Sequence, residues 1–117
     1  MSNSTDGPIR ISITGRRHEF LIGRSVIQLL GDPDCLCVLK SEDKQTIAIT
    51  PCSSVLPLSF SIPSSYYNIK GRKFRIYSKP FTEELVSANG WDRMQTQHVF
   101  GTYNAEQNAV VFPVKVF

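Results

Sequence analysis

Short runs in which apolar and polar residues alternate constrain the fold of this chain more than any other feature. In residues 9–14, isoleucine occupies every second position and polar residues fill the positions between. A period of two places the isoleucines on one face of a β-strand and the polar residues on the other. Similar runs follow at residues 19–22, 46–50 and 73–77. The chain is therefore expected to consist mainly of short, half-buried strands.

Two short helices are predicted between these strands. Residues 25–30 place apolar side chains on one side, Ser25 can cap the start, and Gly31 can end the helix. Residues 80–88 begin with a proline, which suits a first turn because its missing N–H needs no partner there. Further strands are predicted at residues 35–39, 58–62, 97–103 and 109–114.

The predicted elements divide the chain into two similar parts. Phe20-x-Ile22 in the first part corresponds to Phe74-x-Ile76 in the second, and the apolar run at 47–49 corresponds to the run at 110–112. We therefore expect a flexible arm at 1–8 and one domain at 9–117, made of repeats 9–51 and 58–114 joined by a Pro/Ser-rich connection. The expected class is α+β, mostly β: a small β-barrel of two hairpin–helix–hairpin units with one short helix each.

The stretch from Phe20 to Gly31, followed by residues 36–39 and 47–51, resembles the AbrB-type swapped-hairpin family of transition regulators and antitoxins. In that family, a strand leads into a short helix that ends in Leu-Gly, and two more strands follow across an acidic turn. The resemblance implies a barrel made of two copies of this unit. With both copies in one chain, it implies a pseudo-dimeric monomer, with a homodimer as the alternative.

The resemblance also implies contacts to duplex DNA through arginines near the first hairpin. The matching positions are Arg16 and Arg17, with Arg72 and Lys73 in the second copy. The chain departs from the family at the helix, where Ile27 and Gln28 stand in place of paired arginines. The resemblance therefore implies the hairpin part of a DNA contact and no helix part.

Charge distribution gives a second, independent indication of an anionic partner. Net charge is +3, from 13 Lys+Arg against 10 Asp+Glu. Five of the ten residues from Lys70 to Lys79 are basic, and no acidic residue interrupts them. A solvated strand face would explain such a run, but basic residues beside aromatic ones also hold phosphates and stack on bases. The candidate binding residues are Arg16, Arg17, Arg24, Lys70, Arg72, Lys73, Arg75, Tyr77 and Lys79.

These observations predict a non-enzymatic nucleic-acid-binding regulator of the bacterial or phage kind, with duplex DNA as the expected partner. The alternative is a small protein-binding inhibitor or accessory module, such as one encoded by a mobile element. A basic face that gathers residues 70–79 with Arg16 and Arg17 would favour the first. A large exposed apolar patch away from the basic strand would favour the second.

The cysteines, histidines and glycines point to no particular chemistry. Three cysteines, an odd number, do not form the disulfide framework of a small secreted protein. Cys35, Cys37 and Cys52 with His18 or His98 would offer zinc ligands, but Cys-x-x-Cys spacing is absent and cysteine also serves as a small core residue. No nucleophile motif or phosphate-binding glycine loop occurs, so we expect no enzyme, metal or cofactor. Without an apolar leader or membrane-length segment, we expect a cytoplasmic protein.

Overall fold

The computed structural model describes residues 9–52, 59–68 and 73–114, and strands dominate these ranges. The expected arm at 1–8 and the start of the second repeat at 58 lie outside the described residues. The elements are, in chain order, β1 (Arg10–Thr14), η1 (Gly15–Arg17), β2 (Glu19–Ile22), α1 (Arg24–Leu29), β3 (Cys35–Lys40), β4 (Thr46–Pro51), β5 (Ser59–Ser61), η2 (Ser64–Asn68), β6 (Phe74–Tyr77), α2 (Lys79–Asn89), β7 (Thr96–Phe100), β8 (Thr102–Asn104) and β9 (Ala109–Pro113).

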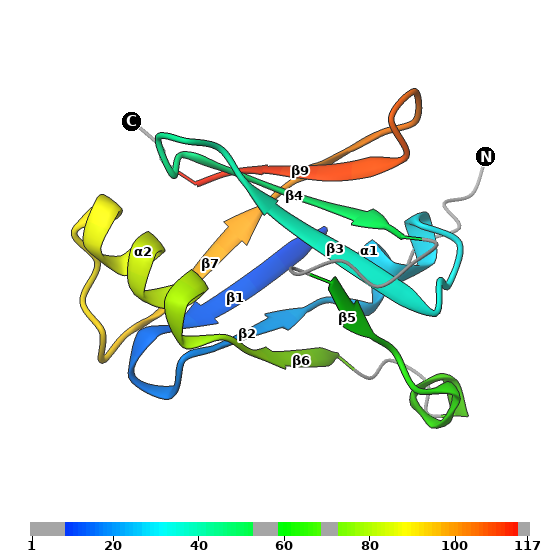
Figure 1. The fold of residues 1–117 in the computed structure, drawn as a ribbon, viewed down its shortest axis with the longest axis horizontal. Helices are drawn as coiled ribbons and strands as arrows, with labels where there is room; N and C mark the ends of the chain where they lie inside the picture. The colour runs from blue at the N-terminus through cyan, green and yellow to red at the C-terminus, as the bar shows by residue number, and fades with distance from the viewer. Residues whose placement is uncertain (1–8, 53–58, 69–72, 115–117) are drawn as a thin grey trace.

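The strands form two antiparallel sheets. Sheet A has the order β6-β2-β1-β7, and sheet B has the order β5-β3-β4-β9-β8. They lie as two layers, with α1 and α2 at opposite ends of the assembly (Figure 1). The predicted class, α+β and mostly β, is confirmed. Within the described ranges no ladder joins one sheet to the other, so closure into a barrel stays a prediction.

The core lies between the two layers and contains the side chains that the alternation placed inward. Ile11 and Ile13 of β1 face inward, as do Phe20 and Ile22 of β2, and none is more than 1% exposed. The ring of Phe20 also stacks on Phe81 of α2, with centroids 5.0 Å apart. Sheet B contributes Leu36, Val38, Ile47, Ile49, Val110 and Phe112, all fully buried.

Two local predictions differ from the structure. Helix α1 begins at Arg24 with Gly23 in the N-cap position, and Ser25 lies inside the helix with 1% of its surface exposed. The strand predicted over 97–103 is interrupted at Gly101, so β7 belongs to sheet A and β8 to sheet B. A Cβ at Gly101 would lie 2.6 Å from the ring of Phe112 and 2.6 Å from the carbonyl oxygen of Val111. Only glycine allows the chain to pass so close to β9 as it changes sheets.

Candidate nucleic-acid interface

The side of sheet A that points away from the core carries most of the polar residues of its four strands. Cross-strand pairing aligns Arg75 with Leu21, Leu21 with Ser12, and Ser12 with His98. The next row runs from Tyr77 through Glu19 and Thr14 to Thr96. We call this surface the outer face of sheet A. Its paired residues are Arg10, Ser12, Thr14, Glu19, Leu21, Arg75, Tyr77, Thr96, His98 and Phe100. We include Lys73, which directly precedes β6 and lines one cleft with Leu21 and Arg75.

Positive charge prevails on this face. Arg10, Lys73 and Arg75 are its arginine and lysine residues, and Glu19 is its one carboxylate among the described residues. Glu19 is 5% exposed, and its Oε2 lies 3.5 Å from Nε of Arg75. The Arg75 side chain itself is 53% exposed. The carboxylate is therefore covered and paired, while the guanidinium above it faces solvent.

Two aromatic side chains stand at opposite corners of the same face. Tyr77 at one edge is 63% exposed, and Phe100 at the other is 58% exposed. Between them, Ser12 Oγ and His98 Nδ1 form a hydrogen bond of 2.8 Å, which orients the imidazole. The rings of Tyr77 and Phe100 are among the four large hydrophobic side chains that are exposed in the described residues, and each is open to contact with a flat ligand.

The turn between β1 and β2 adds further positive charge beside Tyr77. The backbone N–H of Ser78 donates to the carbonyl oxygen of His18 at 2.8 Å, which joins the end of β6 to this turn. As a result, the exposed side chains of Arg16 and Arg17 are brought to the end of β6 that leads into α2. We call Arg16, Arg17, Tyr77 and Lys79 the basic corner.

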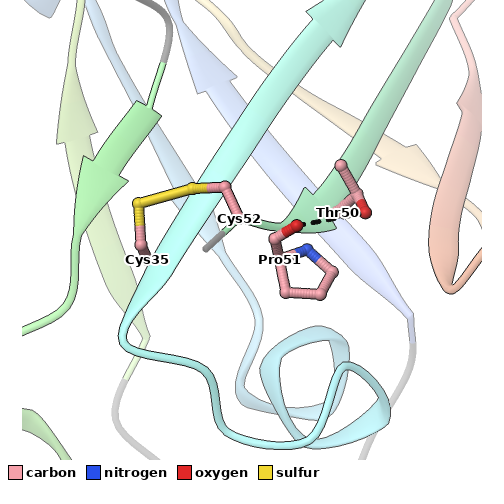
Figure 2. The surroundings of a disulfide bond; sticks show 4 residues. All are labelled: Cys35, Thr50, Pro51 and Cys52. Carbon is pink, nitrogen blue, oxygen red and sulfur yellow. Dashed lines mark hydrogen bonds between the residues drawn. A yellow bond between two sulfur atoms is a disulfide. The ribbon is translucent and has the colours of Figure 1, made fainter. Parts of the chain in front are cut away.

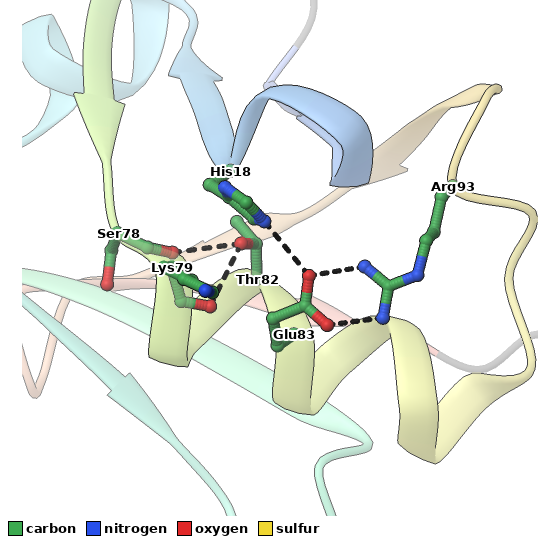
Figure 3. Close-up of polar contacts among 6 residues, drawn as sticks. All are labelled: His18, Ser78, Lys79, Thr82, Glu83 and Arg93. Atoms are coloured by element: carbon green, nitrogen blue, oxygen red, sulfur yellow. Dashed lines mark hydrogen bonds and ion pairs between the residues drawn. The ribbon is translucent and has the colours of Figure 1, made fainter.

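An ion-pair network fixes the geometry of the basic corner (Figure 3). The two terminal guanidinium nitrogens of Arg93, Nη1 and Nη2, donate to the carboxylate of Glu83 on α2. His18 Nε2 donates to the same carboxylate at 3.0 Å. The hydrogen bonds from Arg93, more than the contribution of His18, lower the pKa of Glu83 to about 2. Thr82 Oγ1 also donates to the carbonyl oxygen of Ser78 at 2.9 Å. Turn, strand end and helix are thus held as one unit.

Arg24, another predicted binding residue, has a different role in the structure. Its guanidinium donates to Asp32 at 2.6 Å and lies 5.8 Å and 5.2 Å from the ring centroids of Tyr66 and Tyr67. The hydrogen bond with Asp32 raises the pKa of Arg24. Burial raises the pKa of Tyr67 to about 12, and its hydroxyl donates to Pro33 O at 2.6 Å. Arg24 therefore ties α1 to η2.

The arginine and lysine side chains differ in whether a carboxylate pairs with them. Carboxylates pair with Arg24, Lys40, Arg75 and Arg93. On the β3–β4 hairpin, Lys44 donates to the carbonyl oxygen of Glu42 at 2.9 Å. On the outer face and in the basic corner, Arg75 is paired with a carboxylate. The described residues provide no carboxylate partner for the other cations of these two surfaces. These side chains are Arg10, Arg16, Arg17, Lys73 and Lys79.

Two of the candidates predicted from the sequence, Lys70 and Arg72, lie outside the described residues. Of the outer face, sequence reasoning identified Lys73, Arg75 and Tyr77. Among the residues it missed are Arg10, His98 and Phe100. The alternation of residues 9–14 already put Arg10 opposite the isoleucines, so that signal was present. His98 and Phe100 join the face only because β7 pairs with β1, and no local pattern predicts this pairing.

Two of the three cysteines are joined to each other. Cys35 at the start of β3 and Cys52 just after β4 form a disulfide (Figure 2). Cys37 is free and buried. Hairpin register explains this pairing, because the N–H of Cys52 donates to the carbonyl oxygen of Cys35 at 3.1 Å. Across 9–52, 59–68 and 73–114, three or more potential metal ligands do not cluster, so the zinc set of three cysteines with His18 or His98 is not assembled.

Comparison with known proteins adds no family assignment. No known family, curated protein or solved structure matches the chain. The resemblance to AbrB-type proteins therefore stays a prediction. In the part of the chain that the structure describes, neither helix has the length and apolarity needed to cross a membrane.

Proposed function

We propose that this chain is a non-enzymatic nucleic-acid-binding regulator whose binding surface is the outer face of sheet A with the basic corner. The observation that carries the proposal is that these two adjoining surfaces hold five cations for which the described residues provide no carboxylate partner. Arg16 and Arg17 lie near the end of the β2–β6 ladder where Glu19 pairs with Tyr77. Arg75 lies within that ladder, and Lys73 lies just before its other end at Phe74. Release of counterions from phosphates would supply the binding free energy.

The proposal is tested by two variants that each remove one positive charge. Lys73→Ala removes a cation of the outer face, and Lys44→Asn removes one from the β3–β4 hairpin of sheet B. Asparagine suits position 44 because φ there is 61°. Affinity for labelled DNA and RNA would be measured by fluorescence anisotropy at about 50 and 200 mM salt, a range over which several phosphate contacts change affinity strongly.

We expect Lys73→Ala to weaken binding and to reduce the salt slope by about 0.7 to 0.9 for one lost phosphate contact. Lys44→Asn should leave both quantities unchanged. Adding Arg16→Ala and Arg17→Ala to Lys73→Ala should reduce the slope by about two to three. Equal effects of the two single variants would mean that only net charge matters. Absence of binding at the lower salt would refute the proposal.

The same proposal includes the two-repeat organisation, with residues 9–51 and 58–114 as copies that form one pseudo-dimeric barrel. Strand register supports it. In the β2–β6 ladder Phe20 faces Ile76 and Ile22 faces Phe74, and in the β4–β9 ladder Ile47 faces Phe112. In the repeat, Phe20 corresponds to Phe74 and Ile22 corresponds to Ile76. Each residue of the first copy therefore pairs with the counterpart of the other, as a two-fold axis between the copies would produce. Sedimentation velocity would separate the monomer from the homodimer.

A second candidate function, binding of a protein partner, is favoured by one observation on sheet B. Leu39, 48% exposed, lies beside Ala48, which in turn lies beside Val111, and these residues form an apolar row across β3, β4 and β9. The row is on the sheet that does not carry the unpaired cations. If it binds a protein, Leu39→Glu should abolish that association and leave nucleic-acid affinity unchanged.

A further inference from the structure

The outer face of sheet A points to a more specific ligand class than its charge alone. Resting on the proposed function above, we infer that this face binds single-stranded nucleic acid. The strand would lie across the four β-strands, with bases against Tyr77 and Phe100 and phosphates beside Lys73, Arg75 and Arg10.

The exposed rings carry the first step of this inference. Tyr77 and Phe100 lie on one face, at the two edges of sheet A and two rows apart. Strand spacing and rise put them about 19 Å apart, with the polar side chains of β1 and β2 between them. An aromatic ring on a sheet stacks on a base only when that base is unpaired. Two such rings beside cations therefore favour a single strand.

A cleft at the β6 edge supplies the second step. It has a volume of about 480 Å³ and lies between β6 and the η2 segment. Its lining combines basic, aromatic and apolar side chains, namely Leu21, Pro63, Ser65, Tyr66, Lys73, Phe74 and Arg75. Two cations at its rim suit a phosphate, and the aromatic and apolar wall suits the base attached to it. The cleft thus continues the outer face with room for one splayed nucleotide.

The placement of the helices supplies the third step. Recognition of duplex DNA in the major groove uses a helix or a two-stranded ribbon that projects from the protein. Here α1 and α2 lie at the ends of the two layers and not on the outer face of sheet A (Figure 1). In α1, the guanidinium of Arg24 is bound to Asp32. The cations and rings of the outer face therefore lie on a sheet surface and not on a projecting helix. Lys79 of the basic corner is the first residue of α2.

The test compares nucleic acids of one sequence in different forms. Labelled oligonucleotides of about 12 nucleotides, within the site size of small β domains, would be used as single-stranded DNA, single-stranded RNA and duplex DNA. Tyr77→Ala and Phe100→Ala each remove an aromatic ring, whereas Tyr77→Phe keeps the ring at position 77 and removes only its hydroxyl. Leu39→Ala is the matched control, because it removes an exposed apolar side chain from sheet B. Thermal unfolding of each variant would verify that it folds.

We expect at least one single strand to bind at least tenfold more tightly than the duplex. Each ring-to-alanine change should weaken that binding about 5- to 150-fold, the measured range for one stacked base. Tyr77→Phe and Leu39→Ala should stay within about twofold of the unchanged protein. A preference for DNA or RNA would identify which single strand is bound, because the 2′-hydroxyl distinguishes them.

Two other results would overturn the inference, and they differ in meaning. Equal or tighter binding of the duplex, with no effect of the ring-to-alanine changes, would refute the single-strand assignment and leave the nucleic-acid-binding proposal standing. No binding of any oligonucleotide at low salt would refute both.

Discussion

Replacing Gly101 by alanine should destabilise the protein strongly, because this residue is where the chain passes from sheet A to sheet B. The added Cβ would lie 2.6 Å from the Phe112 ring and 2.6 Å from the carbonyl oxygen of Val111. Phe112 is fully buried and Val111 is held in the β4–β9 ladder, so neither can move aside without disturbing the core. Overpacking of this kind costs about 1 to 3 kcal/mol, and a backbone contact puts this case at the upper end.

Urea unfolding followed by circular dichroism would measure the effect. With a slope of about 1.5 kcal/mol per molar urea, a loss of about 3 kcal/mol lowers the midpoint by about 2 M. Gly31→Ala is the control, since φ there is 84° but nothing lies within 4 Å of an added Cβ. That change should cost only the backbone strain, about 1 to 2 kcal/mol. A Gly101→Ala midpoint equal to or above that of Gly31→Ala would refute the steric explanation.

Two further predictions concern the disulfide and the ion-pair network. Reduction of the Cys35–Cys52 bond, which closes a loop of 17 residues, should lower the free energy of unfolding by about 3 kcal/mol; an unchanged melting temperature in reductant would contradict this. The pKa of Glu83 in the folded state is about 2, below its ordinary value of 4.5. The network therefore stabilises the fold above about pH 4.5 and loses this contribution as the pH falls toward 2. Urea unfolding at pH 5 and at pH 2 would measure how much stability the protein loses on acidification. Arg93→Ala should make this loss smaller. If the variant and the unchanged protein lose the same amount, the network is not the cause of the loss.

Local elements of the fold were predictable because their signals are local. The alternation in residues 9–14 requires only a period of two, and β1 follows it closely. Likewise, the proline near the start of α2 and the glycine after it marked both ends of that helix within a residue. Gly101 was not recognised as the point where a strand ends, because the side chain that excludes a Cβ there belongs to Phe112 in another strand.

For the candidate site, composition indicated the right segment but not which cations are available for a ligand. The basic run that includes Lys73 and Arg75 was evident from the sequence, and both side chains are exposed. Arg24 looked equivalent to them, yet it is engaged by Asp32 and two tyrosine rings. The partner that an arginine binds depends on which segments of the chain meet in the fold. Short connecting segments such as η2 carry no periodic pattern from which such a meeting could be predicted.

The ladders also determine when the protein can fold. Strands β1, β2 and β4 of the first half each pair along one edge with a strand of the second half, namely β7, β6 and β9. Until the partner strands between residues 74 and 113 leave the ribosome, these strands present open edges, which are sites of aggregation. Contacts between residues so distant in sequence also slow folding, because long loops must close first. The isoleucine-rich strands, which are made first, are therefore the strands whose edges stay open longest during synthesis.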